Sequence, residues 1–218
     1  MAANQPQQRA RRQLALARRF SPAAVAFILA AALAGCGSND GGATATASEY
    51  GPITITGNTL PPIDDTTVGT NMDPAVGVTI PEISGEDFFG NPASIELDGR
   101  PKAILFISHS CGYCQQELPD IAGWVNETGG VEGVDLIAIS TSASEFGGNW
   151  PPSDWFEREK WTGPVIVDDE EYTAFSAFGG WVIPFWVFTN GDGVVLGRWA
   201  GLMGADSAES AMQQSLNM

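Results

Sequence analysis

The sequence predicts an α/β domain in which helices cover both faces of a mixed sheet, giving a three-layer α/β/α arrangement. Apolar runs of strand length alternate with helical segments between residues 100 and 190. Asn190-Gly191-Asp192-Gly193 is a strong hairpin turn signal between the last two strands. Strand–helix–strand units give parallel strands, whereas this hairpin is antiparallel. We therefore expect a mixed sheet that ends in a C-terminal antiparallel hairpin.

We expect the folded domain to span residues 79–218, beginning with a short lead-in hairpin over 80–97. Asp98-Gly99-Arg100-Pro101 forms a turn, and Gly129-Gly130 and Gly179-Gly180 each end a helix. Ser153 is the expected N-cap of a short helix. Strands are predicted at 103–108, 134–140, 165–167, 185–189 and 194–199, and helices at 111–127, 153–160, 170–178 and 205–216.

The first 35 residues have the features of a secretory signal peptide. An arginine-rich start precedes a twelve-residue apolar run, Ala23–Ala34, which is too short for a membrane-spanning helix of about 20 residues. Leu33-Ala34-Gly35-Cys36 resembles the lipobox of bacterial lipoproteins, which implies that Cys36 is lipidated and becomes the mature N-terminus. The alternative is an ordinary signal peptide with a chance cysteine. Residues 36–78 are rich in small and polar residues and are interpreted as a lipid-anchored flexible linker.

The charge of the chain argues against nucleic-acid binding. The net charge is −16, and the five arginines before Cys36 leave −21 for the remainder, so no basic patch is available to neutralise phosphates. The simplest interpretation is a solvated acidic surface that favours solubility.

A pair of cysteines follows the predicted strand 103–108 at the start of a helix. Cys111 and Cys114 lie three residues apart, so both fall on one helix face, and the helix N-terminus favours a thiolate at Cys111. We expect Cys111 to attack and the less exposed Cys114 to resolve the mixed disulfide, with this redox-active disulfide as the only cofactor. A structural disulfide is one alternative, although so short a loop removes little chain entropy. The other is a Cu or Zn site with His109, which is otherwise expected to be partly exposed and incidental.

Ser110-Cys111-Gly112-Tyr113-Cys114 after a strand resembles the active site of the thioredoxin fold. The longer pattern Cys111-x-x-Cys114-x-x-Glu117-x-Pro119 is similar to the membrane-anchored TlpA/ResA-type thiol-disulfide oxidoreductases. The segment Gly180–Phe188 resembles the cis-proline loop of that family and the strand that follows it. The resemblance covers residues 79–216. One departure is Ser110, where the family usually has Trp.

The resemblance also implies roles for particular residues. The Ile183-Pro184 bond would be cis and face the cysteine pair, and the Ile183 backbone would hold an extended substrate segment. The alternative is an ordinary trans proline at the start of the strand. Glu117 would lie partly buried beneath the dithiol with a raised pKa and exchange protons with Cys114, the alternative being an exposed helix acid. Trp181 and Tyr113 are the candidate substrate contacts on the surface.

The expected function is that of a thiol-disulfide oxidoreductase outside the cytoplasm, anchored to the membrane through Cys36. By resemblance it reduces specific partner proteins, for example in cytochrome c maturation, as a monomer that exchanges electrons with a membrane redox partner. A general disulfide oxidase or isomerase is one alternative. A non-enzymatic metal carrier that uses His109, Cys111 and Cys114 is another.

Overall fold

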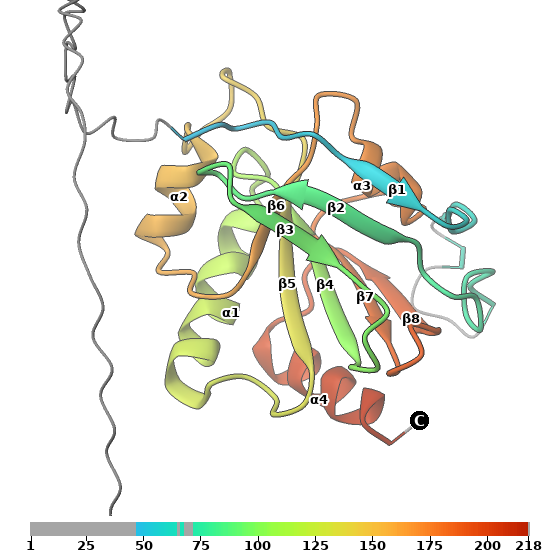
Figure 1. Ribbon diagram of the computed structural model, residues 1–218. Helices are drawn as coiled ribbons and strands as arrows, with labels where there is room; N and C mark the ends of the chain where they lie inside the picture. Colours follow the sequence, from blue (N-terminus) through green and yellow to red (C-terminus); the bar gives the residue numbers. More distant parts are fainter. Residues whose placement is uncertain (1–46, 65, 68–71, 218) are drawn as a thin grey trace, which may run out of the picture. The chain divides into compact units, whose positions relative to one another are not determined.

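The structure, a computed structural model, describes residues 47–64, 66, 67 and 72–217. Strands and helices alternate through most of this range (Figure 1). The elements are β1 (Thr54–Thr56), β2 (Glu82–Glu86), β3 (Pro92–Ile95), β4 (Lys102–Ile107), α1 (Cys114–Thr128), β5 (Asp135–Ser140), α2 (Pro152–Arg158), β6 (Val165–Val167), α3 (Thr173–Ala177), β7 (Phe185–Thr189), β8 (Val195–Ala200) and α4 (Ala205–Ser215).

Five strands form the central sheet in the order β6-β5-β4-β7-β8. The β4–β5 and β5–β6 pairs are parallel, whereas the β4–β7 and β7–β8 pairs are antiparallel. The predicted mixed sheet with a C-terminal antiparallel hairpin is therefore confirmed. All six residues of β4 are buried, as expected for a central strand covered on both faces.

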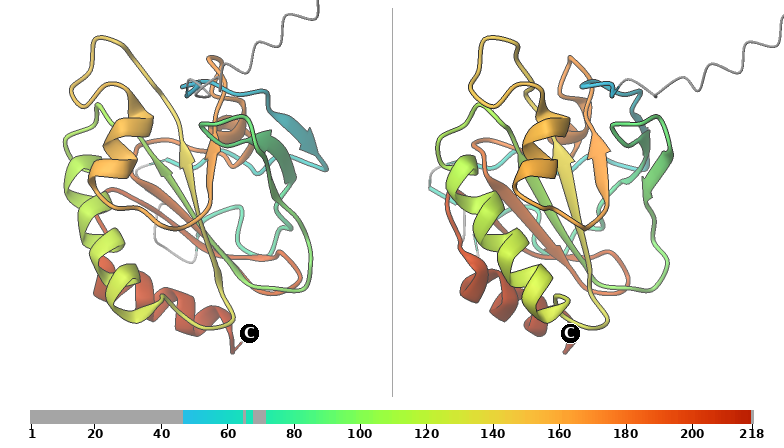
Figure 2. Two further views of the ribbon diagram at one scale, coloured as in Figure 1. Left: turned by 60° about the vertical axis from the view of Figure 1, so that its left-hand side comes forward. Right: turned by 90° about the vertical axis from the view of Figure 1, so that its left-hand side faces the viewer.

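The two faces of the sheet are covered differently (Figure 2). Alternate residues of β4 point to opposite faces, so Leu105 packs with α1 and α4, whereas Phe106 packs with α3 and the strands β2 and β3. The second face is thus covered by the short helix α3 together with a three-stranded antiparallel sheet in the order β1-β2-β3. The sequence predicted a hairpin here, and β1 extends it.

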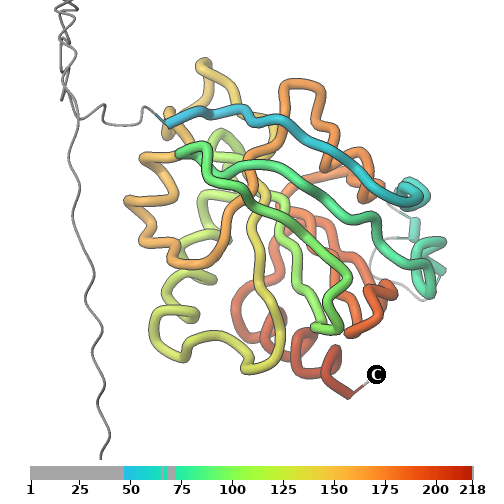
Figure 3. Tube along the Cα trace, viewed as in Figure 1, coloured from blue at the N-terminus to red at the C-terminus, as the bar shows by residue number. Residues whose placement is uncertain are grey.

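The predicted start of the domain at residue 79 is wrong. β1 pairs with β2, and the side chains of Leu60, Ile63 and Ala75 are buried in the core beside α3. Figure 3 traces this upstream segment along the folded unit from residue 47. The described residues 47–64, 66, 67 and 72–78 therefore belong to the domain and are not a linker. The apolar side chains in this segment are widely spaced, but each is buried by a partner distant in sequence. The predicted signal peptide and Cys36 lie outside the described residues.

Helix α1 begins three residues later than predicted, because residues 111–113 form a turn. The first helical hydrogen bond runs from the Gln115 N–H to the Cys111 carbonyl at 3.0 Å. Gly129 ends α1 in the left-handed conformation with φ of 80°, and its N–H bonds the Val125 carbonyl. In the described part of the chain, no helix combines the length and apolar character needed to cross a membrane.

Candidate functional site

The cysteine pair lies at the carboxyl end of β4, where the central strand leads into α1. Both side chains are free thiols in the structure, but their environments differ. Cys111 is partly exposed, whereas Cys114 is fully buried among the apolar side chains between α1 and the sheet. Burial raises the pKa of the Cys114 thiol strongly, and the neighbouring Cys111 and Glu117 raise it further, while a hydrogen bond from the Ser108 backbone opposes them. The thiol open to a partner is therefore Cys111.

A loop before β7 meets the exposed thiol. The Cys111 Sγ lies 3.4 Å from the Ile183 carbonyl oxygen, to which the thiol donates a hydrogen bond. The Ile183-Pro184 peptide bond is cis, as the resemblance implied. Pro184 precedes β7, and its carbonyl accepts a hydrogen bond from Gly201 at the end of β8. The Ile183 carbonyl is thus fixed beside Cys111, where a partner's backbone could meet it.

Glu117 is buried one turn along α1 from Cys114, which excludes the interpretation as an exposed helix acid. Its Oε1 accepts a hydrogen bond from the Trp186 indole N–H at 2.8 Å. The backbone N–H groups of Met203 and Gly204, just before α4, donate to the same carboxyl group at 3.2 Å. Three N–H donors therefore hold the carboxyl group of Glu117 in place beneath the dithiol, where it interacts electrostatically with Cys114.

His109 is fully buried, so the expectation of a partly exposed side chain is wrong. Its Nδ1 lies 2.7 Å from the Gly148 carbonyl, and its Nε2 accepts a hydrogen bond from the Ser144 N–H at 3.1 Å. This network assigns the ring proton to Nδ1. Both nitrogens are engaged by backbone groups, so neither is oriented to share a metal with the two cysteines. Among the described residues, no cluster of three or more His, Cys, Asp and Glu side chains is arranged to hold a metal ion.

The two predicted surface contacts are exposed. Tyr113, in the turn before α1, is 61% exposed, and Trp181, two residues before Ile183, is 45% exposed. Both belong to segments that meet at the Cys111 thiol, because Tyr113 follows it by two residues and Ile183 contacts it. The structure therefore brings Cys111, Cys114, Glu117 and the Ile183-Pro184 loop together, with these two aromatic side chains on the adjoining segments.

Comparison with solved structures identifies the fold. The thioredoxin domain of a thiol-disulfide oxidoreductase from Bacteroides vulgatus is 19% identical, with a TM-score of 0.50 over 64% of this chain and 96% of that one. A thiol:disulfide interchange protein from Chlorobium tepidum is 20% identical, with a TM-score of 0.52 over 63% of this chain and 94% of that one. StoA from Bacillus subtilis is 20% identical, with a TM-score of 0.50 over 63% and 98%. The chain has a thioredoxin-like fold. No protein-family model matches the sequence, and no curated protein matches it.

Within this thioredoxin-like fold, sequence reasoning missed the residues that surround Glu117. Trp186 was not among the predicted site residues, yet its indole N–H donates directly to the carboxylate. The alternating direction of side chains along β7 could have indicated this contact, because Trp186 must face away from Phe185 and toward the helix that carries Cys114. The Met203 and Gly204 donors are backbone groups, for which the sequence carries no signal.

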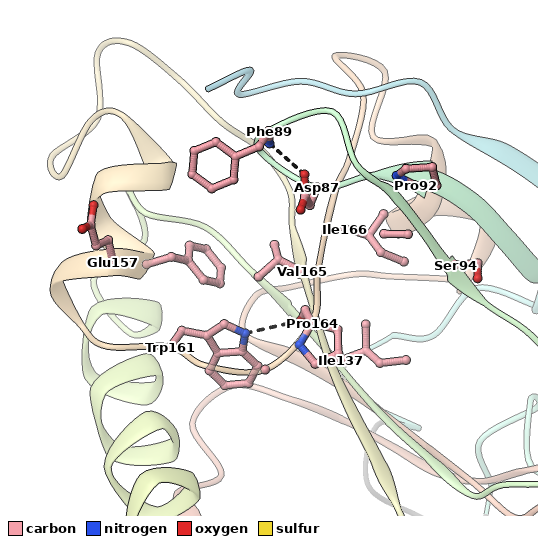
Figure 4. Close-up of a pocket in the computed structure, with 13 residues that line it drawn as sticks. Asp87, Phe89, Pro92, Ser94, Ile137, Glu157, Trp161, Pro164, Val165 and Ile166 are labelled. Carbon is pink, nitrogen blue, oxygen red and sulfur yellow. Dashed lines mark hydrogen bonds between the residues drawn. The ribbon is translucent and has the colours of Figure 1, made fainter. Parts of the chain in front are cut away.

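A groove of about 430 Å³ lies elsewhere in the thioredoxin-like fold (Figure 4). Figure 4 shows Asp87 and Phe89 from the β2–β3 turn, and Trp161 and Pro164 from the segment between α2 and β6, around this space. The Trp161 indole donates to the Pro164 carbonyl at 3.3 Å, so this N–H is already engaged within the protein. The lining includes neither cysteine, so the groove is separate from the dithiol site.

Proposed function

We propose that the chain is a thiol-disulfide oxidoreductase that uses Cys111 as the attacking thiol and Cys114 as the resolving thiol. The observation that carries the proposal is the asymmetry of the pair: Cys111 is partly exposed beside the Ile183 carbonyl, whereas Cys114 is buried with a raised pKa. The fold neighbours from Bacteroides vulgatus and Chlorobium tepidum are named as thiol-disulfide exchange proteins, which agrees with this activity.

The reaction is a reversible exchange of two electrons and two protons. The Cys111 thiolate attacks one sulfur of a partner disulfide, forming a mixed disulfide and releasing the other partner sulfur as a thiolate. The Cys114 thiolate then attacks the Cys111 sulfur, which forms the Cys111–Cys114 disulfide and releases the second partner thiolate. Both released thiolates take up protons. The partner is reduced and the protein oxidised, and a dithiol donor restores the starting state.

Glu117 supports the second step of this scheme. Cys114 must lose its proton before it attacks, and burial makes that loss costly. The Glu117 carboxylate is the ionisable group held one helical turn from Cys114 by three N–H donors. We assign it the role of proton acceptor for Cys114 during resolution.

The proposed setting is outside the cytoplasm, with a lipid on Cys36 holding the domain at the membrane surface and a membrane redox partner exchanging electrons with it. In this setting the dithiol reduces particular partner proteins, for example the cysteines of apocytochrome c during cytochrome c maturation. Replacing Cys36 by Ala should release the protein from the membrane fraction. Retention of the Cys36→Ala variant in that fraction would contradict the anchor.

The activity is tested by reduction of insulin disulfides with dithiothreitol as the electron donor. The wild-type protein should accelerate the reduction, and Cys111→Ser should abolish the acceleration because the attacking sulfur is lost. An unchanged rate in Cys111→Ser would overturn the proposal. The reduction potential of the Cys111–Cys114 pair then shows whether the protein reduces or oxidises its partners. A value of about −270 mV fits a reductant, whereas a value of about −120 mV fits the alternative of a general disulfide oxidant.

A further inference from the structure

The loop between β5 and α2, residues 142–150, is attached to the segment that carries the dithiol. We call this segment the β5–α2 loop. Its main attachment is His109, the one histidine of the chain, which lies two residues before Cys111. Both ring nitrogens are used for this purpose, one by the Gly148 carbonyl and the other by the Ser144 N–H. The Trp150 ring adds an edge contact to the imidazole, with ring centroids 5.7 Å apart.

Further hydrogen bonds hold the β5–α2 loop from several directions. The Ser108 hydroxyl donates to the Ser142 carbonyl at 3.1 Å, and the Asn149 amide donates to the His109 carbonyl at 3.3 Å. The Tyr50 hydroxyl, from the segment before β1, donates to the Ala143 carbonyl at 3.0 Å. These hydrogen bonds to other segments of the fold therefore fix the position of the loop at both of its ends.

The middle of the β5–α2 loop packs against the residue before the attacking cysteine. Gly147 lies so close to Ser110 that a Cβ added to the glycine would come within 3.2 Å of the Ser110 Cα. The neighbouring Phe146 is completely exposed. A fully exposed phenylalanine stabilises nothing in the free protein, although burial of its ring against another apolar side chain is strongly favourable. Phe146 directly precedes Gly147 in the chain, which places its backbone close to Ser110, the residue before Cys111.

The charge of the domain indicates what kind of partner approaches. Residues 47–218 contain 25 acidic and five basic side chains, a net charge of 25 − 5 = 20 negative charges. Four of the five basic side chains are in ion pairs, which leaves the acidic excess to set the field at the surface. The β5–α2 loop itself carries an acid, Glu145, and no base. Such a field attracts and orients a cationic polypeptide.

We propose that the β5–α2 loop is a partner-recognition element, in which Phe146 binds an apolar side chain next to the reactive cysteine of a basic polypeptide, and His109 positions the loop. This inference rests on the proposed exchange activity and adds to it the class of partner. Phe146 contacts the partner away from its reacting sulfurs, so it contributes to binding and not to the exchange step. His109 acts through the loop and is a positioning residue.

The test uses Phe146→Ser and the matched control Phe89→Ser, which removes another exposed phenylalanine, 60% exposed, from the β2–β3 turn. The probes are a lysine-rich peptide disulfide with Leu beside its cysteine, the same peptide with Ala in place of Leu, and hydroxyethyl disulfide. For Phe146→Ser we expect KM for the Leu peptide to rise about tenfold at unchanged kcat, as loss of a buried apolar contact predicts. KM for the Ala peptide and the rate with hydroxyethyl disulfide should stay at their wild-type values. Phe89→Ser should behave as wild type throughout.

Several outcomes would overturn the inference. An unchanged KM for the Leu peptide in Phe146→Ser would do so. An equal rise of KM for the Ala peptide in Phe146→Ser, or of KM for the Leu peptide in Phe89→Ser, would do so too. A wild-type KM that does not rise with added salt would contradict the attraction of a cationic partner. If the wild-type protein does not react even with hydroxyethyl disulfide, the proposed function itself fails, which is a separate result.

The positioning role of His109 has its own readout. His109→Gln keeps a buried polar side chain but cannot replace both ring hydrogen bonds at once. The Ser144 amide should then exchange its hydrogen faster, and KM for the Leu peptide should rise while the rate with hydroxyethyl disulfide is kept. If hydrogen exchange at the Ser144 amide and KM for the Leu peptide are both unaltered, the positioning role of His109 is contradicted.

Discussion

The buried ion pair between Asp73 and Arg198 tests whether the segment upstream of residue 79 belongs to the domain. The Arg198 guanidinium donates to both carboxylate oxygens, at 2.9 and 2.5 Å, and the two side chains are 0% and 1% exposed. Its Nη1 nitrogen donates to the Pro61 and Phe178 carbonyls. In Asp73→Asn the guanidinium would stay buried without a countercharge, with an amide NH2 facing its donors. Removing one partner of a buried pair costs about 3–5 kcal/mol.

The free energy of unfolding is measured from urea denaturation followed by tryptophan fluorescence, with the m-value expected to stay constant. In thermal unfolding the same loss corresponds to a fall in Tm of roughly 6–20 °C for a domain of this size. Glu159→Gln is the matched control, because its ion pair with Arg158 is partly exposed to solvent and should contribute no more than about 1 kcal/mol. A loss below about 1 kcal/mol in Asp73→Asn would refute the claim that this segment is an integral part of the core.

Three further predictions concern acid stability and the dithiol. Burial alone would raise the pKa of Asp135, but hydrogen bonds and ion pairs with Arg100 and Lys102 lower it below its usual 3.8. A depressed folded pKa stabilises the protein above the unfolded pKa and loses that effect as pH falls, so the unfolding free energy should decline from about pH 5 to pH 2, and less steeply in Asp135→Asn. Glu117→Gln removes a charge that raises the pKa of Cys114, so the thiol absorbance of Cys114 in a Cys111→Ser background should titrate at lower pH; an unmoved titration would exclude the electrostatic role. Iodoacetamide at neutral pH should modify Cys111 well before Cys114, as peptide mass spectrometry can determine, and the reverse order would contradict the assigned roles.

The features that sequence predicted correctly depend on local signals. The apolar run of β4, the cysteine pair and the helix α1 follow one another between residues 102 and 128, and Asn190–Gly193 specifies its hairpin through turn chemistry. The cis Pro184 that the family resemblance implied directly precedes β7 in the structure. These signals are local, so they can be recognised without knowledge of the tertiary structure.

The features that were missed depend on contacts between distant residues. Asp73 is buried because Arg198, 125 residues later, completes its ion pair. Ser153 was expected to cap α2, but its hydroxyl and its N–H both bond the Glu49 carboxylate, 104 residues earlier. His109 is likewise buried by the backbone of a loop about 35 residues downstream. The side-chain partners of Asp73 and Ser153 are far away in the sequence, and the partners of His109 are backbone groups, which leave no mark in a sequence. These pairings could therefore not be predicted.

The most direct test of the proposed exchange mechanism is to trap the mixed disulfide. Cys114→Ser protein is incubated with an oxidised model peptide, and the intact mass is measured with Cys111→Ser as the comparison. Because Cys111 is the exposed thiol and Cys114 the one that resolves, Cys114→Ser should accumulate one covalently bound peptide at Cys111, whereas Cys111→Ser should remain unmodified. Trapping at Cys114 in the Cys111→Ser protein, or no adduct in Cys114→Ser, would contradict the mechanism.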